Sequence, residues 1–273
     1  MTIPQFQEKI LSWYKKNRRD LPWRNTKDPY HILVSEVMLQ QTQVARVLPK
    51  YKEFLQKFPT LKTLAEASDK TILQTWASLG YWRRAKYLKQ IAKILGNLVP
   101  KSLGTKFPST PDALEMLPGI GHYTARALAC FAFGNTEAFL DTNIRRVYLH
   151  FFFPERKNVS DAEILPIAKR AVWKKNPREW HYALFDYGAT VLKDKKINKR
   201  SKHYAKQSKF EGSFRSFRTK VMRFLLDQPN QTAASSKIER LLTKSGSPYA
   251  TEKIFASLEK DGLIKKKGNS LSL

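Results

Sequence analysis

The stretch 117–147 constrains the fold of this chain more than any other part of the sequence. It opens with a Pro-Gly-Ile-Gly turn, in which proline removes a backbone donor and Gly119 and Gly121 permit positive φ, so the preceding helix must end there. Helical spacing resumes at Tyr123 and stops at Gly134. The pattern therefore predicts a helix-hairpin-helix. Glycines in the turn would let its backbone N–H groups approach a phosphate oxygen closely. An ordinary turn between two helices is the alternative.

One acidic residue, Asp141, lies twenty residues past Gly121 and directly before a predicted helix that starts at Thr142. The free N–H groups and the dipole at a helix start favour a carboxylate in its anionic form. Asp141 could serve only as a helix cap. Beside a hairpin that holds a phosphate, however, an ionised aspartate would stabilise positive charge that develops on a sugar.

The chain of 273 residues carries 50 Lys and Arg against 23 Asp and Glu, a formal charge of +27. So basic a chain points to nucleic acid before any other partner. A membrane surface is the rival, but the sequence has no long uncharged apolar run and no lipidation motif. Cys130, the one cysteine, lies in an apolar helical stretch, which excludes disulfides and a cysteine metal cluster. The N-terminus does not resemble a signal peptide, so we expect a cytoplasmic, nucleoid-associated protein that does not bind membranes.

Residues 29–41 are nearly all apolar, which predicts a buried helix. Glu36 lies inside this run, although carboxylates are rarely buried without a partner or a task. Desolvation would raise its pKa and let it deliver a proton near neutral pH. The alternative is a glutamate that faces water or pairs with an arginine. In the loop just before, Trp23 and Arg24 could stack on or hydrogen-bond to a base, or they could be a core tryptophan beside a surface arginine.

Two turns in the first half of the chain carry side chains suited to nucleic acid. The segment 40–43, Gln-Gln-Thr-Gln, separates two predicted helices and could insert into a base stack or merely cap them. After Gly80 come Tyr81, Trp82 and two arginines, a combination suited to insertion and to phosphate contact. No segment of this half alternates with a period of two, so the pattern predicts an all-α structure.

Composition changes after residue 192. The segment 193–220 holds eleven Lys or Arg and two acids, and in an already basic chain this favours a run along a phosphate backbone over a solvated linker. We therefore expect Lys199, Arg200 and Lys202 to contact DNA.

The tail has the pattern of a separate small module. Three predicted helices are followed by a basic hairpin about a Gly-Asn turn, an order that suggests a winged helix. Such a module could bind DNA or contact a protein, and the sequence does not choose between them. The helices are expected at 214–226, 234–244 and 248–261, and the hairpin at 263–273.

Five motifs, in this order along the chain, resemble those of the MutY-type adenine DNA glycosylases. These belong to the helix-hairpin-helix superfamily that also contains endonuclease III, and the resemblance covers roughly residues 5–192. Five motifs in the same order are a far stronger signal than any one alone. They are LPW at 21–23, SEVMLQQTQV at 35–44, LGYW at 79–82, LPGIGHYTA at 117–125 and LDTNIRRV at 140–147.

The resemblance implies a two-lobed, all-helical glycosylase fold, to which this chain adds a small C-terminal winged-helix-like module. We expect a helix-hairpin-helix core at 1–192, a basic linker in place of the family's iron–sulfur loop at 193–213, and the module at 214–273. It also implies an enzyme that binds double-stranded DNA with a mispair and flips out adenine paired with guanine or 8-oxoguanine. Hydrolysis of the N-glycosidic bond would leave an abasic site. We expect this enzyme to be a monomer.

By position, the resemblance implies roles for single residues. Glu36 corresponds to the acid that protonates the adenine ring, and Asp141 to the carboxylate that stabilises the sugar cation, with or without a covalent intermediate. Tyr123 falls in the catalytic pocket and Asn143 near the reacting sugar. The positions that line the adenine pocket are Trp23, Arg24, Leu39 and Asp186, and those that wedge the duplex are Gln41 and Tyr81.

The chain departs from the family in two places. The four positions that would hold the iron–sulfur cluster carry no cysteine, so we expect no cluster and no other cofactor. These positions are Leu192, Lys199, Lys202 and Ser208. We also expect the tail from Phe214 to stand in place of the family's usual C-terminal domain, which senses 8-oxoguanine. The preference for the opposite base is therefore left open.

Two rival functions differ from this one in testable ways. A thymine or uracil mismatch glycosylase would share the scaffold, but its leaving base is already a fair anion and gains less from ring protonation. A non-catalytic DNA-binding protein would lack one of the two carboxylates, and both are present. A strand-cleaving lyase of this superfamily uses a lysine in the second helix of the hairpin, where this chain has Tyr123. We therefore expect a glycosylase without efficient strand cleavage.

Overall fold

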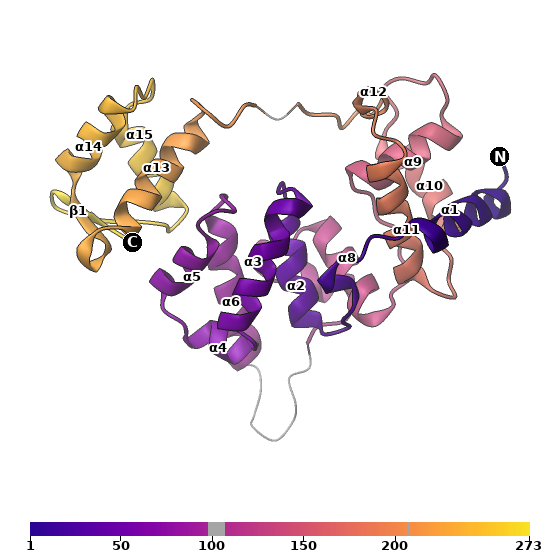
Figure 1. Cartoon of the computed structure of the whole chain (residues 1–273), viewed down its shortest axis with the longest axis horizontal. Coiled ribbons are helices and arrows are strands. Elements are labelled where there is room, and N and C mark those ends of the chain that lie inside the picture. Colours follow the sequence, from indigo (N-terminus) through magenta and orange to yellow (C-terminus); the bar gives the residue numbers. More distant parts are fainter. Residues whose placement is uncertain (98–106, 207) are drawn as a thin grey trace. The chain divides into compact units, whose positions relative to one another are not determined.

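Figure 1 shows the computed structural model of the chain, which describes residues 1–97, 107–206 and 208–273. The described residues are mostly helical, with three short strands near the C-terminus, so the predicted helical class is confirmed. Contacts group them into two compact units. The first unit consists of residues 1–36 and 107–206 and the second of residues 37–97 and 208–273, so each unit joins two separated stretches of the chain.

The helices of the first unit begin at polar caps that the sequence supplies. Thr2 and Ser160 form capping boxes, and the Asn176 side chain accepts a hydrogen bond from a backbone N–H. The elements are the 3-10 helix η1 (Pro22–Arg24) and the α-helices α1 (Ile3–Asn17), α7 (Pro111–Glu115), α8 (His122–Phe133), α9 (Thr142–Phe152), α10 (Asp161–Ala171), α11 (Pro177–Thr190) and α12 (Lys195–Asn198), while α2 (Pro29–Leu39) contributes residues to both units.

Phe6 of α1 lies at the centre of an aromatic core in the first unit. Its ring centroid is 5.5 Å from that of Tyr148 on α9 and 5.5 Å from that of Trp180 on α11, the latter pair edge to face. All three side chains are buried. Because this contact removes a large apolar surface from water, it fixes α9 against α11. The packing thereby sets the position of the α9 N-terminus, which carries the candidate site.

The second unit combines four helices from the first third of the chain with the C-terminal residues. Trp76 lies in its helical core, where it packs edge-on against Phe54 at 5.9 Å and donates its indole N–H to the Gly80 carbonyl oxygen at 3.0 Å. The elements are α3 (Val44–Lys57), α4 (Leu61–Glu66), α5 (Asp69–Trp76) and α6 (Arg83–Asn97), followed by α13 (Phe214–Leu226), η2 (Pro229–Gln231), β1 (Thr232–Ala234), α14 (Ser235–Lys244), α15 (Thr251–Lys260), β2 (Lys265–Lys267) and β3 (Ser270–Ser272).

The C-terminal residues form a three-stranded antiparallel sheet in the order β1-β3-β2. The sequence predicted the β2–β3 hairpin but assigned Ala234 to a helix and missed β1. Three residues are too few to show a period of two, and β1 forms because β3 offers it a second edge, with Leu271 buried opposite Ala233. The lysines of β2 are all exposed.

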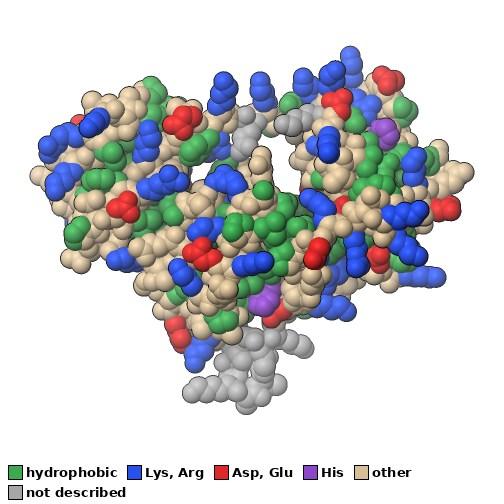
Figure 2. All heavy atoms as spheres, viewed as in Figure 1, with side chains coloured by type: hydrophobic (Ala, Val, Ile, Leu, Met, Phe, Trp, Pro, Cys, Tyr) green, Lys and Arg blue, Asp and Glu red, His purple; other side chains and the backbone are tan. Residues whose placement is uncertain are grey.

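Positively charged side chains are widespread on the face of the molecule that Figure 2 shows. Figure 2 shows Lys and Arg side chains spread widely over one face, with fewer Asp and Glu among them. Within the part of the chain that the structure describes, no helix is long and apolar enough to span a bilayer. The surface is therefore suited to a polyanionic partner, as the net charge predicts.

Arg84, at the start of α6, is a buried cation of the second unit. Its guanidinium donates to the carbonyl oxygens of Val37 and Met38 at 2.9 Å each, and to those of Leu79 and Gly80 at 3.3 and 3.2 Å. The last carbonyl oxygens of a helix lack donors within the helix, and Arg84 supplies the donors for those of α2. Burial lowers the pKa of this group to about 10, so it stays charged at neutral pH. The sequence suggested a phosphate contact here, whereas Arg84 binds the chain's own backbone.

We expect Arg84→Met to lower the free energy of unfolding by about 3 kcal/mol, because several buried carbonyl oxygens lose their donor. Urea unfolding followed by circular dichroism measures this. The neighbouring Arg83 is exposed and forms a surface ion pair with Asp261, so Arg83→Met should cost about 1 kcal/mol or less. Equal losses in the two variants would contradict a bracing role for Arg84.

Candidate active site

The hairpin between α7 and α8 has the geometry that its sequence predicts, with one difference. Gly119 adopts φ 74°, the left-handed region that favours glycine, whereas Gly121 has φ −96° and acts as the N-cap of α8. Only the first glycine therefore needs its conformational freedom. Leu117 and Ile120 are buried and anchor the turn on the first unit.

Tyr123, in the first turn of α8, lies beside Glu36 of α2. Its phenol donates a hydrogen bond to the Glu36 carboxyl group, and its ring packs edge-on against Phe139 at 5.7 Å. Both contacts lie within the first unit. Tyr123, at the start of α8, thus contacts Glu36, which is the one acidic residue of the apolar helix α2.

Glu36 is buried, with 7 % of its surface exposed, as the sequence predicts. Burial raises the pKa of its carboxyl group to about 8, and the negative charge of Asp141 acts in the same direction. The Tyr123 hydrogen bond and the positive charge of Arg24 oppose the shift without cancelling it. Glu36 therefore holds a proton near neutral pH.

Asp141 is the N-cap of α9. The Ile144 backbone N–H donates to one carboxylate oxygen at 2.6 Å, and the Asn143 side-chain amide donates to the other at 3.0 Å. These donors favour the anion, as the sequence predicts, but burial has the larger effect and raises the pKa of Asp141 above its usual range. The sequence indicated the helix start and gave no sign of this desolvation.

Arg24 is held in place by Asp186 of α11. The two guanidinium nitrogens of Arg24 donate to the two carboxylate oxygens at 2.8 Å each, and Arg19 adds a bond from its Nε at 2.6 Å. Asp186 is fully buried, and both arginines hold its pKa below the usual range against the effect of burial. The Arg24 guanidinium lies 4.4 Å from the ring centroid of Tyr182. Asp186 thus fixes the orientation of the Arg24 guanidinium.

The structure separates the other predicted site residues. Trp23 is 3 % exposed, so it fits the core alternative for this position. Leu39, Gln41 and Tyr81 belong to the second unit, while Asn143 lies with Asp141 in the first. Sequence analysis missed Arg19 and Tyr182. A buried aspartate on an otherwise apolar helix face was the available signal that a cation such as Arg19 must lie opposite.

Gly188 of α11 allows α9 to approach closely. A Cβ atom at this position would lie 2.4 Å from the backbone oxygen of Asn143, a distance that real Cβ atoms essentially never show. Arg146 strengthens the contact by donating to the Gly188 carbonyl oxygen at 2.6 Å. The N-terminus of α9, with Asp141, is therefore positioned by the absence of a side chain on α11.

Residues 34–171 match the model of the HhH-GPD superfamily of base excision DNA repair proteins. The chain belongs to the HhH-GPD superfamily. The matched residues include Glu36, Tyr123 and Asp141, so the two carboxyl groups and the tyrosine between the hairpin and α2 lie inside the region that defines the family.

Curated relatives of this HhH-GPD chain include adenine DNA glycosylases. The human protein is 38 % identical over 202 residues, which cover 69 % of this chain and 36 % of that protein. The Mycobacterium tuberculosis protein is 44 % identical over 139 residues, covering 50 % and 44 % respectively. The chain thus spans less than half the length of these two relatives. The resemblance to the adenine DNA glycosylases is confirmed.

Among solved structures, the HhH-GPD chain is similar to a thermostable thymine-DNA glycosylase. The TM-score is 0.64 and the identity 29 %, covering 71 % of this chain and 89 % of the other. A DNA complex of endonuclease III has a TM-score of 0.56 at 21 % identity, covering 68 % of this chain and 86 % of that one, which supports the fold alone.

The four positions that the sequence resemblance assigned to an iron–sulfur cluster carry side chains that do not fit one. Of the four positions, Leu192 is buried and apolar, Lys199 and Lys202 are exposed cations, and Ser208 has no thiol. The described residues contain no group of three or more His, Cys, Asp or Glu side chains that could hold a metal ion. A cluster held by thiolates is incompatible with these side chains.

The segment after α11 is held by hydrogen bonds. Arg146 donates to the Asn198 side chain at 2.9 Å, and Arg200 donates to the Leu149 carbonyl oxygen at 2.8 Å. Val159 pairs with this segment as well, since its N–H donates to the Arg200 carbonyl oxygen at 2.9 Å. Arg200 is therefore turned inward, while its neighbours Lys199 and Lys202 are exposed.

We expect Gly188→Ala to lower the free energy of unfolding by about 1–3 kcal/mol, because the added methyl group would push α9 away from α11. Thermal or urea unfolding measures this. Gly96→Ala in α6 is the matched control, since a Cβ atom there meets nothing within 4 Å, and it should be neutral or stabilise by up to about 1 kcal/mol. If both variants unfold like the wild type, the close approach does not exist in solution.

Proposed function

We propose that the chain is a monofunctional DNA N-glycosylase that hydrolyses the N-glycosidic bond of adenine mispaired with guanine or 8-oxoguanine and leaves an abasic site. One observation carries the proposal: Glu36 and Asp141 are two neighbouring carboxyl groups in different environments, Glu36 within an apolar helix with its pKa raised to about 8, and Asp141 at the start of α9 with two N–H donors on its oxygens. Similarity to curated adenine DNA glycosylases supports the choice of base.

Adenine is a poor leaving group as an anion, so its ring must be protonated as the bond breaks. In the proposal, Glu36 gives this proton, because its buried carboxyl group still carries one at neutral pH. Tyr123 orients the carboxyl group through its hydrogen bond. The proton leaves with the base, and Glu36 becomes a carboxylate.

Asp141 then faces the sugar as positive charge develops on it. Its carboxylate is held by the Ile144 N–H and the Asn143 amide, so it needs no rearrangement as the charge appears. The negative charge of Asp141 also raises the pKa of Glu36. Each carboxyl group therefore favours the protonation state that the other requires.

The extrahelical base would lie near Arg24. The Arg24 guanidinium lies over the Tyr182 ring. A base can stack on such groups and accept hydrogen bonds from the guanidinium. In this proposal Asp186 keeps Arg24 in its orientation.

Mispaired double-stranded DNA is the proposed partner, bound by a monomer in the cytoplasm or nucleoid. The backbone of the hairpin at Gly119 and Gly121 would contact a phosphate, and Gln41 and Tyr81 would wedge into the duplex. Exposed Lys199 and Lys202 would extend the contact along the backbone. The α8 sequence contains no lysine, which supports a glycosylase without the Schiff-base lyase step.

A thymine or uracil mismatch glycosylase is the second candidate, favoured by the similarity to a thermostable thymine-DNA glycosylase. Such a base leaves more readily as an anion than adenine does and gains less from ring protonation. The raised pKa of Glu36 therefore favours adenine.

The deciding experiment is single-turnover base release from duplexes that carry A, T or U opposite G. We expect adenine release, lowered a hundredfold or more by Glu36→Gln, in line with the roughly 10²–10⁴ of general acid–base catalysis. Asp141→Asn should abolish release and leave DNA binding intact. Glu53→Gln on α3 is the control, because that carboxylate pairs with Lys50 on the surface. Release of thymine or uracil with adenine retained would reject the proposal in favour of its rival.

The rate should also depend on pH. Release by the wild type should fall as pH rises through about 8, since Glu36 then loses the proton that it must donate. At acid pH it should fall again as Asp141 becomes protonated, at a pH above the usual range of an aspartate. Glu36→Gln should remove the alkaline fall, and a fall of unchanged position in that variant would assign it to another group.

The salt dependence of DNA affinity tests whether the basic segment around Lys199 and Lys202 contacts phosphates. Replacing Lys199 and Lys202 by Gln should flatten the slope of log affinity against log salt by about 0.9 for each phosphate that is no longer neutralised. Arg200→Gln should instead lower stability, because its guanidinium binds Leu149. Exposed Lys169 on α10 provides a control charge. A slope that stays the same in the Lys199 and Lys202 double variant would make the segment a solvated linker.

A further inference from the structure

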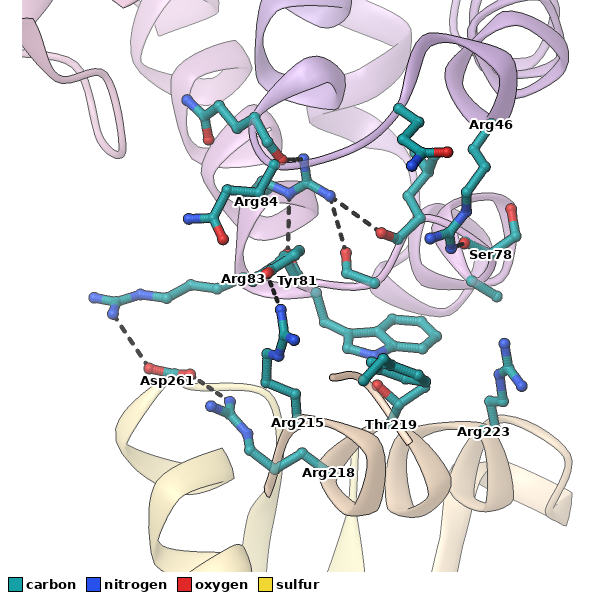
Figure 3. A pocket seen from close by; sticks show the side chains of 18 of the residues that line it. Arg46, Ser78, Tyr81, Arg83, Arg84, Arg215, Arg218, Thr219, Arg223 and Asp261 are labelled. Carbon is teal, nitrogen blue, oxygen red and sulfur yellow. Dashed lines mark hydrogen bonds and ion pairs between the residues drawn. The ribbon is translucent and has the colours of Figure 1, made fainter. Parts of the chain in front are cut away.

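The second unit contains a pocket of about 650 Å³ that is open to solvent. Its walls are the segments 40–46 and 77–87 on one side, and helix α13 with Ser208, Phe210 and Asp261 on the other. This volume lies in the range of roughly 300–1,000 Å³ typical of ligand sites. Figure 3 shows Arg215 and Arg223 extending from α13 toward the opposite wall, whereas Arg218 extends to Asp261.

The described lining of this pocket is strongly cationic. It holds six arginines and a single carboxylate, Asp261. Aromatic rings and glutamine amides line the same space. The arginines are Arg46, Arg83, Arg84, Arg215, Arg218 and Arg223, the aromatic residues are Tyr81, Trp82, Tyr87 and Phe210, and the glutamines are Gln40, Gln41 and Gln43. Guanidinium groups beside aromatic rings are the combination that binds phosphates and bases together.

Two residues of the wall have unusual backbone conformations. Gln41 has φ 55° and Tyr81 has φ 46°, although neither is glycine. Each such residue costs roughly 1–3 kcal/mol and persists only where the surroundings hold it. Arg84 holds both turns. Its guanidinium donates to the carbonyl oxygens of Leu79 and Gly80, just before Tyr81. It also donates to the carbonyl oxygen of Gln40, just before Gln41. Strain that is maintained in this way, at the edge of a pocket, indicates a role for both side chains.

The C-terminal residues complete the pocket through specific contacts. The Arg215 guanidinium donates to the Tyr81 hydroxyl and lies 5.4 Å from the centroid of the Tyr81 ring. Asp261 pairs with Arg83 at 3.2 Å and also with Arg218 of α13. These contacts join α13 and α15 to the start of α6, so the pocket has walls from both parts of the second unit.

Two of the cations are available for a ligand. Arg223 is exposed and forms no ion pair with any residue that the structure describes. Arg46 is exposed and donates to the backbone oxygen of Ser78, a neutral acceptor that does not cancel its positive charge. The net charge of the lining therefore favours a polyanion.

We propose that α13 and the turns of Gln41 and Tyr81 form one joint site for a DNA strand, in which Arg46 and Arg223 contact phosphates and Tyr81, held by Arg215, contacts a base. The C-terminal residues are then part of the surface that binds the substrate. A protein partner fits less well, since a protein interface of this kind would need several buried acids on the partner to match five excess positive charges. The inference rests on the proposed function for the identity of the nucleic acid as mispaired DNA.

The test measures binding alone, so it does not depend on base release. Affinity of the full chain for a fully paired fluorescent DNA duplex is measured by anisotropy over a range of salt concentrations. Arg223→Gln should flatten the log–log salt slope by about 0.9, the value for one phosphate contact, and Arg223→Lys should restore it because the charge is retained. Arg240→Gln is the matched control, an exposed arginine of α14 outside the pocket, and should leave the slope unchanged.

A double-mutant cycle tests whether the site is joint. Tyr81→Phe removes the hydroxyl that receives the Arg215 bond, so the fold-loss of affinity in Tyr81→Phe with Arg215→Gln should be smaller than the product of the two single losses. Independent, multiplying losses would overturn the joint site. If the salt slope of Arg223→Gln equals that of Arg240→Gln, the joint DNA site is also overturned. These residues would then bind another partner, such as a protein. A chain that passes both tests yet releases no adenine would reject the proposed reaction and retain this site.

Discussion

The interaction on which the site depends is the pairing of two carboxyl groups in different environments. Glu36 is buried in an apolar helix, Asp141 is only partly buried at the start of α9, and the negative charge of Asp141 raises the pKa of Glu36. Burial is produced by the apolar run around Glu36 and by the packing of α9 on α11. The catalytic proposal is therefore a consequence of the hydrophobic core, since the core decides which carboxyl group keeps its proton.

Arginine has two separate uses in this chain. Arg24, Arg84 and Arg146 are largely buried, and their guanidinium groups bind Asp186, turn carbonyls and Asn198 respectively. A guanidinium suits this task because five donors in a plane can serve several acceptors at once. The formal charge of +27 thus overstates the charge that can meet DNA. Exposed groups such as Lys199, Lys202 and Arg223 are those whose charge reaches solvent.

Local features of both fold and site could be read from the sequence, and long-range ones could not. Asp141 as a cap, Gly134 as a stop and Glu36 as a buried carboxylate follow from neighbours within a few residues, where spacing and propensity act. The Arg24–Asp186 pair joins residues 162 apart, and the contact of Gly188 with Asn143 joins two helices whose sequences give no sign of each other. Strand β1 was missed for the same reason, because its pairing partner lies at the end of the chain.

The interleaving of the two units has a consequence for synthesis. Residues 37–97 and 208–273 belong to one unit, and about 110 residues separate them along the chain. At roughly 5–20 residues per second, the ribosome needs about 5–20 s after residue 97 before it begins to deliver the second half of this unit. During that time the walls of the cationic pocket formed by the Gln41 and Tyr81 turns stand without α13. Until α13 has been made, Arg46 and Arg83 are the exposed cations of this wall, and the pocket gains half of its arginines only with the last part of the chain.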